Sequence, residues 1–231
     1  MTPHDFHQNR SLRIGLFGGT FNPIHRGHLQ VALDVRQQLK LDDIYFIPSS
    51  LPPHKGTRQL AAARDRLEMV RLAIGDRSGL TPCGLELERK GPSYSIDTVR
   101  SIRKRLTDAH QLYFIIGLDA FLEIHTWKAF RQLFEETSLA VMSRPRSGQW
   151  TDTTVEEALA YVQRHIASDY RLKREEYSLI HPTKQSIHLL PVTPVDISSS
   201  RIRTGIRKGE TIDRWVAPPV VRYIQQKGLY Q

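Results

Sequence analysis

The sequence predicts an α/β protein with a doubly wound, Rossmann-like parallel sheet, organised as a single domain over residues 1–231. Short apolar runs typical of buried strands alternate along the chain with longer segments whose apolar residues recur every three or four positions. This alternation indicates a parallel sheet covered by helices on both faces. The turns that carry chemically reactive residues fall beyond the expected strand ends, where sheets of this class bind ligands.

The first expected strand is the apolar run from Ile14 to Phe17, which breaks at Gly18 and Gly19. Apolar residues at helical spacing then predict a helix that begins near His28 and continues to about Leu39. Glycines allow the backbone to approach a ligand closely, and the N–H groups and dipole of a helix N-terminus favour negative charge. A strand, a glycine turn and a helix start therefore predict a phosphate-binding site.

The later elements are predicted from the same two periodicities. Apolar runs or alternating patterns indicate strands at 43–48, 84–88, 112–116 and 139–143. Helical spacing indicates helices at 62–74 and 95–106. Residues 144–186 differ, because a loop rich in Pro, Gly and Ser precedes an amphipathic helix and a charged stretch. We expect these residues to form a helical embellishment of the same domain.

The composition favours a globular protein with a sizeable core, since 39% of the residues are hydrophobic and 25% are charged. The polar first twelve residues lack the apolar core of a signal peptide, and the longest apolar run, Leu112 to Leu118, is too short to cross a bilayer. The single cysteine, Cys83, precludes a disulfide within the chain and suits a reducing compartment. We therefore expect a cytoplasmic protein with no membrane partner.

The net charge of +9 suits nucleic acids or small anionic substrates. No zinc-finger, RNP-type or heptad pattern accompanies the charge, and the basic residues at 100 and 103–105 are expected on a solvated helix surface. We therefore expect small phosphorylated substrates and no nucleic-acid partner. The sequence leaves the oligomeric state open, and a homo-oligomer is compatible with it.

His25 and His28 are three positions apart, so they lie on one face of the first helical turn. A pair of histidines at this spacing, without other signals, is usually only the polar start of a helix. A second interpretation is that the two histidines bind zinc. The position directly after a strand and a glycine pair favours phosphate binding instead. No third Cys or His ligand is evident nearby, so no metal site is predicted. The absence of a Gly-x4-Gly-Lys-Ser/Thr motif excludes a Walker A loop.

A second phosphate motif is predicted near the carboxyl end, where Ser198, Ser199 and Ser200 precede a helical run. Serines at this position are ordinary helix N-caps. That interpretation does not account for Arg203, one turn later, which would point to where a phosphate held by the serine N–H groups lies.

Both motifs resemble those of the T/HxGH nucleotidyltransferase superfamily, with Asn22 in place of the usual aspartate and Ser200 in place of the usual threonine. The segments 52–55, 91–98 and 117–127 are similar to one branch, the bacterial nicotinate-nucleotide adenylyltransferases. The similarity runs from Gly15 to Ile224 and is weakest in 144–186. It implies transfer of AMP from ATP to nicotinate mononucleotide in NAD biosynthesis, with Mg²⁺ as cofactor and with deamido-NAD and pyrophosphate as products.

The resemblance also implies a role for each candidate residue. The catalytic group is His25, His28 and Arg203, and the ATP phosphates are held by Gly18, Gly19, Thr20, Phe21, Ser198, Ser199 and Arg203. For the acceptor, Trp127 stacks on the nicotinate ring, and its carboxylate meets N–H groups around Tyr94 and Ser95 and next to Trp127. His54 and Lys55 contact substrate phosphate, and Asp119 either holds a ribose hydroxyl or caps a helix.

Three other classes of protein share part of this pattern. A phosphopantetheine adenylyltransferase of the same superfamily carries threonine where His25 stands. A class I tRNA synthetase shares the HxGH signature, but this chain is short and lacks a KMSKS-like loop. A non-catalytic nucleotide sensor is disfavoured because both histidines and Arg203 are intact.

Overall fold

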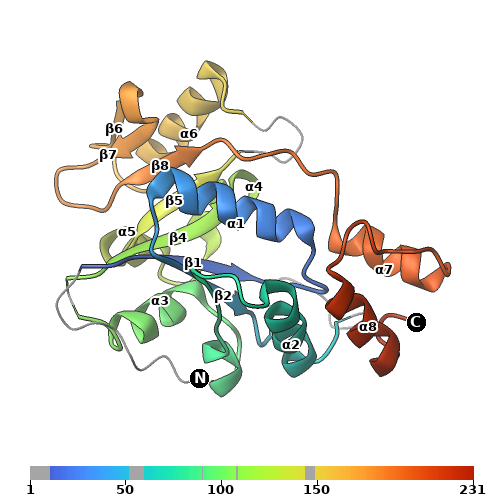
Figure 1. Ribbon diagram of the computed structural model, residues 1–231. Helices are drawn as coiled ribbons and strands as arrows, with labels where there is room; N and C mark the ends of the chain where they lie inside the picture. Colours follow the sequence, from blue (N-terminus) through green and yellow to red (C-terminus); the bar gives the residue numbers. More distant parts are fainter. Residues whose placement is uncertain (1–10, 52–59, 90, 108, 144–148) are drawn as a thin grey trace.

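The computed structural model describes residues 11–51, 60–89, 91–107, 109–143 and 149–231, and its strands form one eight-stranded sheet (Figure 1). The order is β3-β2-β1-β4-β5-β8-β7-β6, in which the first six strands are parallel and the last two pairings, β8 with β7 and β7 with β6, are antiparallel. The strands are β1 (Arg13–Gly19), β2 (Asp43–Pro48), β3 (Leu80–Pro82), β4 (Gln111–Gly117), β5 (Ser138–Met142), β6 (Arg171–Lys173), β7 (Ser178–Ile180) and β8 (Ile187–Leu190).

The strand order reverses between β1 and β4, because the chain first moves outward through β2 and β3 and then returns to pair β4 with β1. Phe17 on β1 lies opposite Phe46 on β2 and Ile115 on β4. A reversal of this kind leaves a crevice at the carboxyl ends of the two central strands, because their following connections leave toward opposite faces. The predicted phosphate turn, 18–21, lies at this point, although the strand β1 continues through Gly18 and Gly19 and does not break at Gly18.

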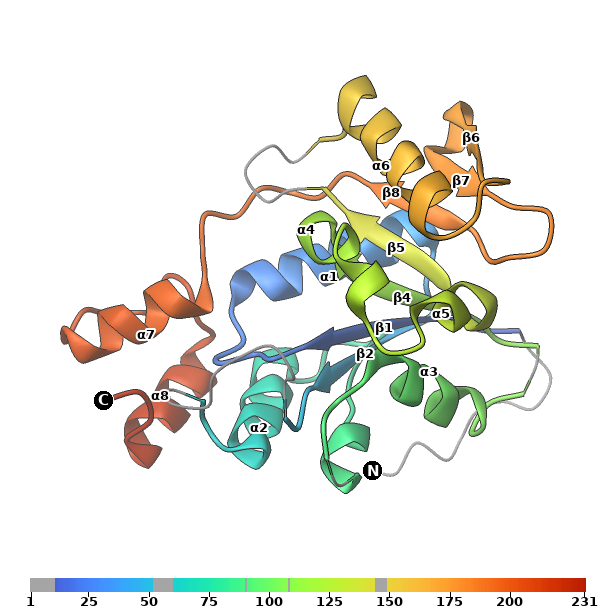
Figure 2. The ribbon, with the colours of Figure 1, turned by 180° about the vertical axis from the view of Figure 1, so that it is seen from behind.

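Helices cover both faces of the sheet, as predicted for a doubly wound fold. Figure 1 shows α1 and α2 on the near side of β1 and β2, and Figure 2, seen from behind, shows α4 and α5 on the near side. One face packs against α1 (Arg26–Leu39), α2 (Ala63–Ile74), α7 (Ser199–Arg207) and α8 (Pro218–Lys227). The other packs against α3 (Ser95–Arg103), α4 (Leu118–Phe121), α5 (Phe130–Glu136) and α6 (Asp152–His165).

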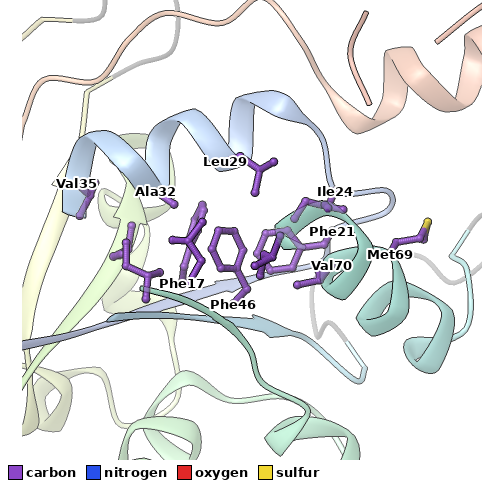
Figure 3. Close-up of a cluster of buried hydrophobic side chains, with 14 of the residues drawn as sticks. Phe17, Phe21, Ile24, Leu29, Ala32, Val35, Phe46, Met69 and Val70 are labelled. Atoms are coloured by element: carbon purple, nitrogen blue, oxygen red, sulfur yellow. The ribbon is translucent and has the colours of Figure 1, made fainter. Parts of the chain in front are cut away.

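The two hydrophobic clusters follow from the period of two along each central strand. On β1, Ile14 and Leu16 belong to one cluster, whereas Phe17 belongs to the other. Figure 3 shows the cluster that contains Phe17, where Phe17 and Phe46 lie between α1 and the strands β1 and β2 and Phe21 lies near α2. The ring centroids of Phe17 and Phe21 are 5.6 Å apart with an edge-on geometry. This aromatic cluster fixes the base of the turn that follows β1.

The predicted strands at 43–48, 112–116 and 139–143 and the helices at 62–74 and 95–106 are found, although the last one ends at Arg103. The strand predicted at 84–88 is wrong, because residues Leu85–Glu88 form a 3-10 helix, η1. Neighbouring residues Leu85 and Glu86 are both buried, which an alternating strand with one solvated face does not allow. The short strand β3 precedes it instead.

The described part of the expected embellishment, 149–186, contains α6 as predicted but is not only helical. It also contributes β6, a 3-10 helix η3 (Arg174–Glu176) and β7, and the two strands extend the sheet beyond β8. Both strands have only three residues and take their conformation from pairing at the sheet edge, so no periodicity reveals them. No helix in the described ranges is long and apolar enough to cross a membrane.

Candidate active site

Two cavities open beyond the carboxyl ends of β1 and β4. One, the histidine cavity, has a volume of about 770 Å³ and is lined by His25, His28 and Arg203 among others. The other, the tryptophan cavity, has a volume of about 500 Å³ and is lined by Tyr94 and Trp127 among others. Phe17 and Thr20 line both cavities, so the two spaces meet at the end of β1. The turn after β1 therefore stands between two binding volumes.

The two histidines stack at the start of α1. His25 is the N-cap, and its backbone N–H donates a hydrogen bond to Nδ1 of His28 (3.2 Å). The two ring centroids are 3.7 Å apart, with 22° between the planes. Because Nδ1 of His28 accepts this bond, the neutral imidazole carries its proton on Nε2. The backbone thereby fixes which nitrogen of His28 is a donor.

His25 is neutral at physiological pH, because burial lowers the pKa of its imidazole to about 4. Its Nδ1 is buried and has no hydrogen-bond partner among the residues that the structure describes. Gly27 allows this packing, since a Cβ there would lie 3.0 Å from Cγ2 of Ile197 and 3.1 Å from Nδ1 of His25. The glycine of the HxGH motif thus brings the histidines against the segment that precedes α7.

The turn after β1 is held from several sides. The N–H of Ser49, after β2, donates to the carbonyl of Gly19 (2.9 Å). Phe21 adopts a positive φ of 47° and packs its ring edge-on against His28, with centroids 5.1 Å apart. A Cβ at Gly19 would lie 2.9 Å from the Phe21 ring, so the turn requires glycine there. Gly18, Gly19 and Thr20 line the tryptophan cavity, and Thr20 and Phe21 line the histidine cavity.

The start of α7 lies on the opposite wall of the histidine cavity. Oγ of Ser198 accepts a hydrogen bond from the N–H of Arg201 (3.2 Å), which makes Ser198 the N-cap. The hydroxyl of Ser199 donates to the carbonyl of Pro23 (2.9 Å) and ties the helix to the turn. The serine side chains are therefore structural. An anion would instead be bound by the backbone N–H groups at the start of α7, which have no acceptor within the helix.

Arg203 reaches across to the turn after β1. Its Nη1 donates to the carbonyl of Asn22 (2.8 Å), and its Nη2 donates to Oγ of Ser200 (3.2 Å). Nε is buried and lacks a hydrogen-bond partner within the described ranges. Burial lowers the pKa of this guanidinium from its usual value, although an arginine stays charged at neutral pH. The cavity therefore contains a fixed cation with an unused donor.

Asn22 stands where the family usually has aspartate, and its side chain is part of the scaffold. Its Oδ1 accepts hydrogen bonds from the N–H of Ala61 (3.0 Å) and from the hydroxyl of Tyr230 (2.8 Å). Both partners are donors, so an amide oxygen serves here as well as a carboxylate oxygen. The bond to Tyr230 also fastens the end of the chain beneath the turn.

Arg66 is a residue that the sequence interpretation missed. Its side chain is fully buried and donates to three carbonyl groups: Nε to Ala61 (2.9 Å), Nη1 to Thr20 (2.8 Å) and Nη2 to Ser50 (3.2 Å). It thus connects the turn after β1 to the loop after β2. Its place on the apolar face of α2, three and four positions before Met69 and Val70, is the sequence signal that points to burial.

In the tryptophan cavity, Trp127 is half-buried and stands edge-on to Phe114, with ring centroids 6.2 Å apart. Tyr94 is the N-cap of α3 and Ser95 its first residue, so the start of a helix lines this space. The first N–H groups of a helix have no acceptor in a preceding turn. The N–H of Trp127 itself donates to the carbonyl of Ile124 (3.0 Å) and is therefore occupied.

Two charged side chains that the sequence interpretation did not single out also line the tryptophan cavity. Nζ of Lys128 is 2.9 Å from Oδ2 of Asp97 and 4.6 Å from the centroid of the Tyr94 ring. Glu86 is buried, and its Oε1 accepts from the hydroxyl of Thr98 (2.6 Å). Oε2 of Glu86 has no hydrogen-bond partner in the part of the chain that the structure describes.

Three further residues were predicted from the sequence for the acceptor site: Asp119, His54 and Lys55. Asp119 is exposed, is the second residue of α4 and is not among the residues that line either cavity. The N-cap of α4 is Gly117, so the capping alternative for Asp119 is wrong. His54 and Lys55 lie outside the described residues.

Comparisons with known proteins find relatives over nearly the whole chain. Residues 16–205 match a family model described as cytidylyltransferase-like. A probable nicotinate-nucleotide adenylyltransferase of Desulfatibacillum aliphaticivorans is 37% identical over 95% of this chain and 100% of its own length. A protein of the same name from Citrifermentans bemidjiense is 38% identical over 95% of this chain and 98% of its own.

Among solved structures, the Plasmodium falciparum nicotinic acid mononucleotide adenylyltransferase complexed with NaAD has a TM-score of 0.67 at 18% identity, with 95% of this chain and 97% of that chain covered. This likeness confirms the doubly wound α/β fold. The sequence relatives confirm the resemblance found in the two phosphate motifs, since they cover nearly the whole chain at well over 30% identity. The chain therefore belongs to the nicotinate-nucleotide adenylyltransferases, nucleotidyltransferases of the cytidylyltransferase-like family.

Proposed function

We propose that this enzyme transfers AMP from ATP to nicotinate mononucleotide and forms deamido-NAD and pyrophosphate, a step of NAD biosynthesis. One observation carries the proposal: a cavity rich in hydrogen-bond donors and an aromatic cavity meet at Thr20, so two substrates bound there would bring their phosphates together. The names of the sequence relatives support the same substrates.

The reaction needs alignment more than acid–base chemistry. A phosphate oxygen of nicotinate mononucleotide attacks the α-phosphorus of ATP, a new P–O bond forms, and the bond from the α-phosphorus to the bridging oxygen breaks. The electron pair of that bond leaves with pyrophosphate. The attacking phosphate is already an anion, so no general base is required. The protein must hold two anions in line and stabilise the charge that builds on the phosphoryl oxygens.

In the histidine cavity, His25 and His28 would donate hydrogen bonds to the α- and β-phosphates, and the bond at Nδ1 of His28 leaves Nε2 as its donor. The neutral ring of His25 donates without first having to lose or gain a proton. Arg203 and the N–H groups at Ser198 and Ser199 would hold the β- and γ-phosphates and then pyrophosphate. The turn N–H groups at 18–21 would face the phosphates from the side of β1.

In the tryptophan cavity, Trp127 would stack on the nicotinate ring. That ring is a pyridinium cation, and indole offers the strongest cation–π face among the side chains. The nicotinate carboxylate would meet the N–H groups at the start of α3, near Tyr94 and Ser95. The contacts of His54 and Lys55 with substrate phosphate, and of Asp119 with a ribose hydroxyl, remain predictions.

Magnesium would arrive with ATP as part of the substrate. In the described ranges no group of three or more His, Cys, Asp or Glu side chains could hold a metal ion, and the described lining of the histidine cavity contains no carboxylate. Such a site suits an ion whose ligands are phosphate oxygens and water. Bound in this way, magnesium would withdraw charge from the phosphates and favour the departure of pyrophosphate.

The function is tested by pyrophosphate release from ATP and magnesium with three acceptors: nicotinate mononucleotide, its amide and phosphopantetheine. We expect the fastest release with nicotinate mononucleotide. The variant His28→Ala should lose about 10²–10³ in rate, as when one donor to a developing oxyanion is removed. Release with phosphopantetheine alone would indicate a phosphopantetheine adenylyltransferase. Release with none of the three would indicate a non-catalytic nucleotide sensor.

A further inference from the structure

Trp127 is carried by a short segment with one inner and one outer side. The segment comprises α4 and the 3-10 helix η2 (Ile124–Thr126), and Trp127 is the C-cap of η2. On its inner side, Phe121 and Ile124 are fully buried in the core. On its outer side, His125 is exposed to solvent. A one-turn 3-10 helix has too few internal hydrogen bonds to fix its own orientation.

Helix α6 supports the outer side of this segment. The hydroxyl of Tyr161 accepts a hydrogen bond from the backbone N–H of His125 (3.2 Å) and also bonds Nδ1 of the same residue (2.8 Å). The rings of His125 and His165 stack with centroids 4.6 Å apart, and the Tyr161 ring packs against Phe121 at 5.7 Å. Two residues of α6, one turn apart, therefore hold one residue of η2.

Helix α6 is itself well anchored. Its Val155, Ala158 and Val162 are buried in the core, and Thr151 caps its start through the N–H of Thr154 (3.2 Å). In both views α6 lies with β6 and β7 at the end of the sheet away from α7 (Figures 1 and 2). The helix is therefore a fixed support against which a less regular segment can rest.

We infer that Tyr161 is a positioning residue for the acceptor site, because it fixes η2 through His125 and so fixes the orientation of Trp127. The N–H of Trp127 bonds the carbonyl of Ile124 within η2, so a rotation of this turn carries the indole with it. A stacking contact is worth most when the ring is already held in its bound orientation. This inference rests on the proposed function for the identity of the ligand, and it gives the segment 149–186 a role.

Tyr170 offers a matched control in the same segment. Its hydroxyl donates to the carbonyl of Gln185 (2.8 Å), and its side chain is fully buried. Tyr170→Phe therefore removes one tyrosine hydroxyl from the fold just as Tyr161→Phe does, but away from η2. A merely structural role for Tyr161 would make the two variants alike in substrate binding.

The test compares the two variants by tryptophan fluorescence titration with nicotinate mononucleotide and, separately, with ATP. We expect Tyr161→Phe to raise the Kd of nicotinate mononucleotide about three- to tenfold, the effect of one or two modest hydrogen bonds, and to leave the Kd of ATP unchanged. Tyr170→Phe should lower the Tm and leave both Kd values unchanged. An unchanged Kd for nicotinate mononucleotide in Tyr161→Phe, or an equal loss for both ligands, would overturn the inference.

A measurement without ligand separates this inference from the proposed function. Protein labelled with 5-fluorotryptophan has three fluorine sites, and the resonance of position 127 is assigned with a Trp127→Phe sample. We expect Tyr161→Phe to shift or broaden that resonance and Tyr170→Phe to leave it in place. If the resonance of position 127 changes in Tyr161→Phe while the wild-type protein binds no nicotinate mononucleotide, the positioning role of Tyr161 is confirmed and the proposed substrate is wrong. If the resonance does not change, the inference fails whatever the substrate.

Discussion

Arg203 donates a hydrogen bond from Nη1 to the carbonyl of Asn22 (2.8 Å), across 181 positions of sequence. A second link of the same kind, from the hydroxyl of Ser199 to the carbonyl of Pro23, lies beside it. The two phosphate motifs at opposite ends of the chain are therefore one structural unit. A change at Arg203 should affect both the charge in the histidine cavity and the position of the turn after β1.

Arg203→Ala should lower kcat/KM for ATP by about 10²–10³, because it removes the donor that we propose for the ATP phosphates. Arg203→Lys should recover little of this loss, since a lysine lacks the planar guanidinium that donates to Asn22 and to Ser200 at the same time. Arg207→Ala, on the same helix, is the control, because Arg207 is exposed and bonds Thr204. Steady-state kinetics would contradict the role if Arg203→Ala and Arg207→Ala were equally active.

Arg66→Met should destabilise the fold by about 3 kcal/mol or more, because it removes a fully buried guanidinium that donates to three carbonyl groups. Urea denaturation at neutral pH measures the change. Arg64→Met lies on the exposed side of the same helix and should change stability by less than about 0.5 kcal/mol. Equal stability of the two variants would show that the carbonyl groups find other partners.

The burial of His25 makes the stability depend on pH. Its pKa is about 4 in the folded protein and about 6.5 when exposed, so the unfolded chain takes up a proton first as the pH falls. Stability is therefore lost as the pH falls from about 6.5 toward 4. Between pH 7 and pH 4.5 this amounts to about 2 kcal/mol.

Burial also lowers the pKa of His188, so the stability of the wild type depends on pH through both histidines. Comparison with His25→Gln isolates the contribution of His25, because the contribution of His188 cancels in the difference. The free energy of unfolding of the wild type minus that of the variant should fall by about 2 kcal/mol between pH 7 and pH 4.5. A difference that stays constant with pH would mean that His25 takes up its proton as readily in the folded state as in the unfolded chain, and would contradict the lowered pKa.

Lys128 should contribute to the choice between the acid and amide forms of the acceptor. Among the described residues that line the tryptophan cavity it is the one cation, and it lies over the ring of Tyr94. Lys128→Met should lower the ratio of kcat/KM for nicotinate mononucleotide to that for its amide about fivefold. The factor is small because the side chain is 51% exposed and solvent screens its charge. Lys104→Met is the control, and an unchanged ratio in Lys128→Met would assign the preference to the N–H groups of α3.

The sequence by itself determined the strand–turn–helix unit at 13–39, the serine N-cap before α7 and the family. Each of these depends on neighbouring residues: apolar periodicity, glycines in a turn, and hydroxyls before a helix. The expected convergence of His25, His28 and Arg203 on one cavity also follows from this fold class, because its motifs gather at one edge of the sheet.

Only the tertiary structure decided the features that depend on distant contacts. Arg66 is an ordinary helical arginine until three carbonyl groups, one from the turn after β1 and two from the connection between β2 and α2, surround it. Residues 85–88 alternate like a strand, yet they form a 3-10 helix in which the neighbours Leu85 and Glu86 are both buried. Likewise, β6 and β7 exist because β8 offers an edge to pair with, and Tyr161 meets His125 because α6 packs beside η2. Such pairings depend on the whole packed arrangement, so no local pattern contains them.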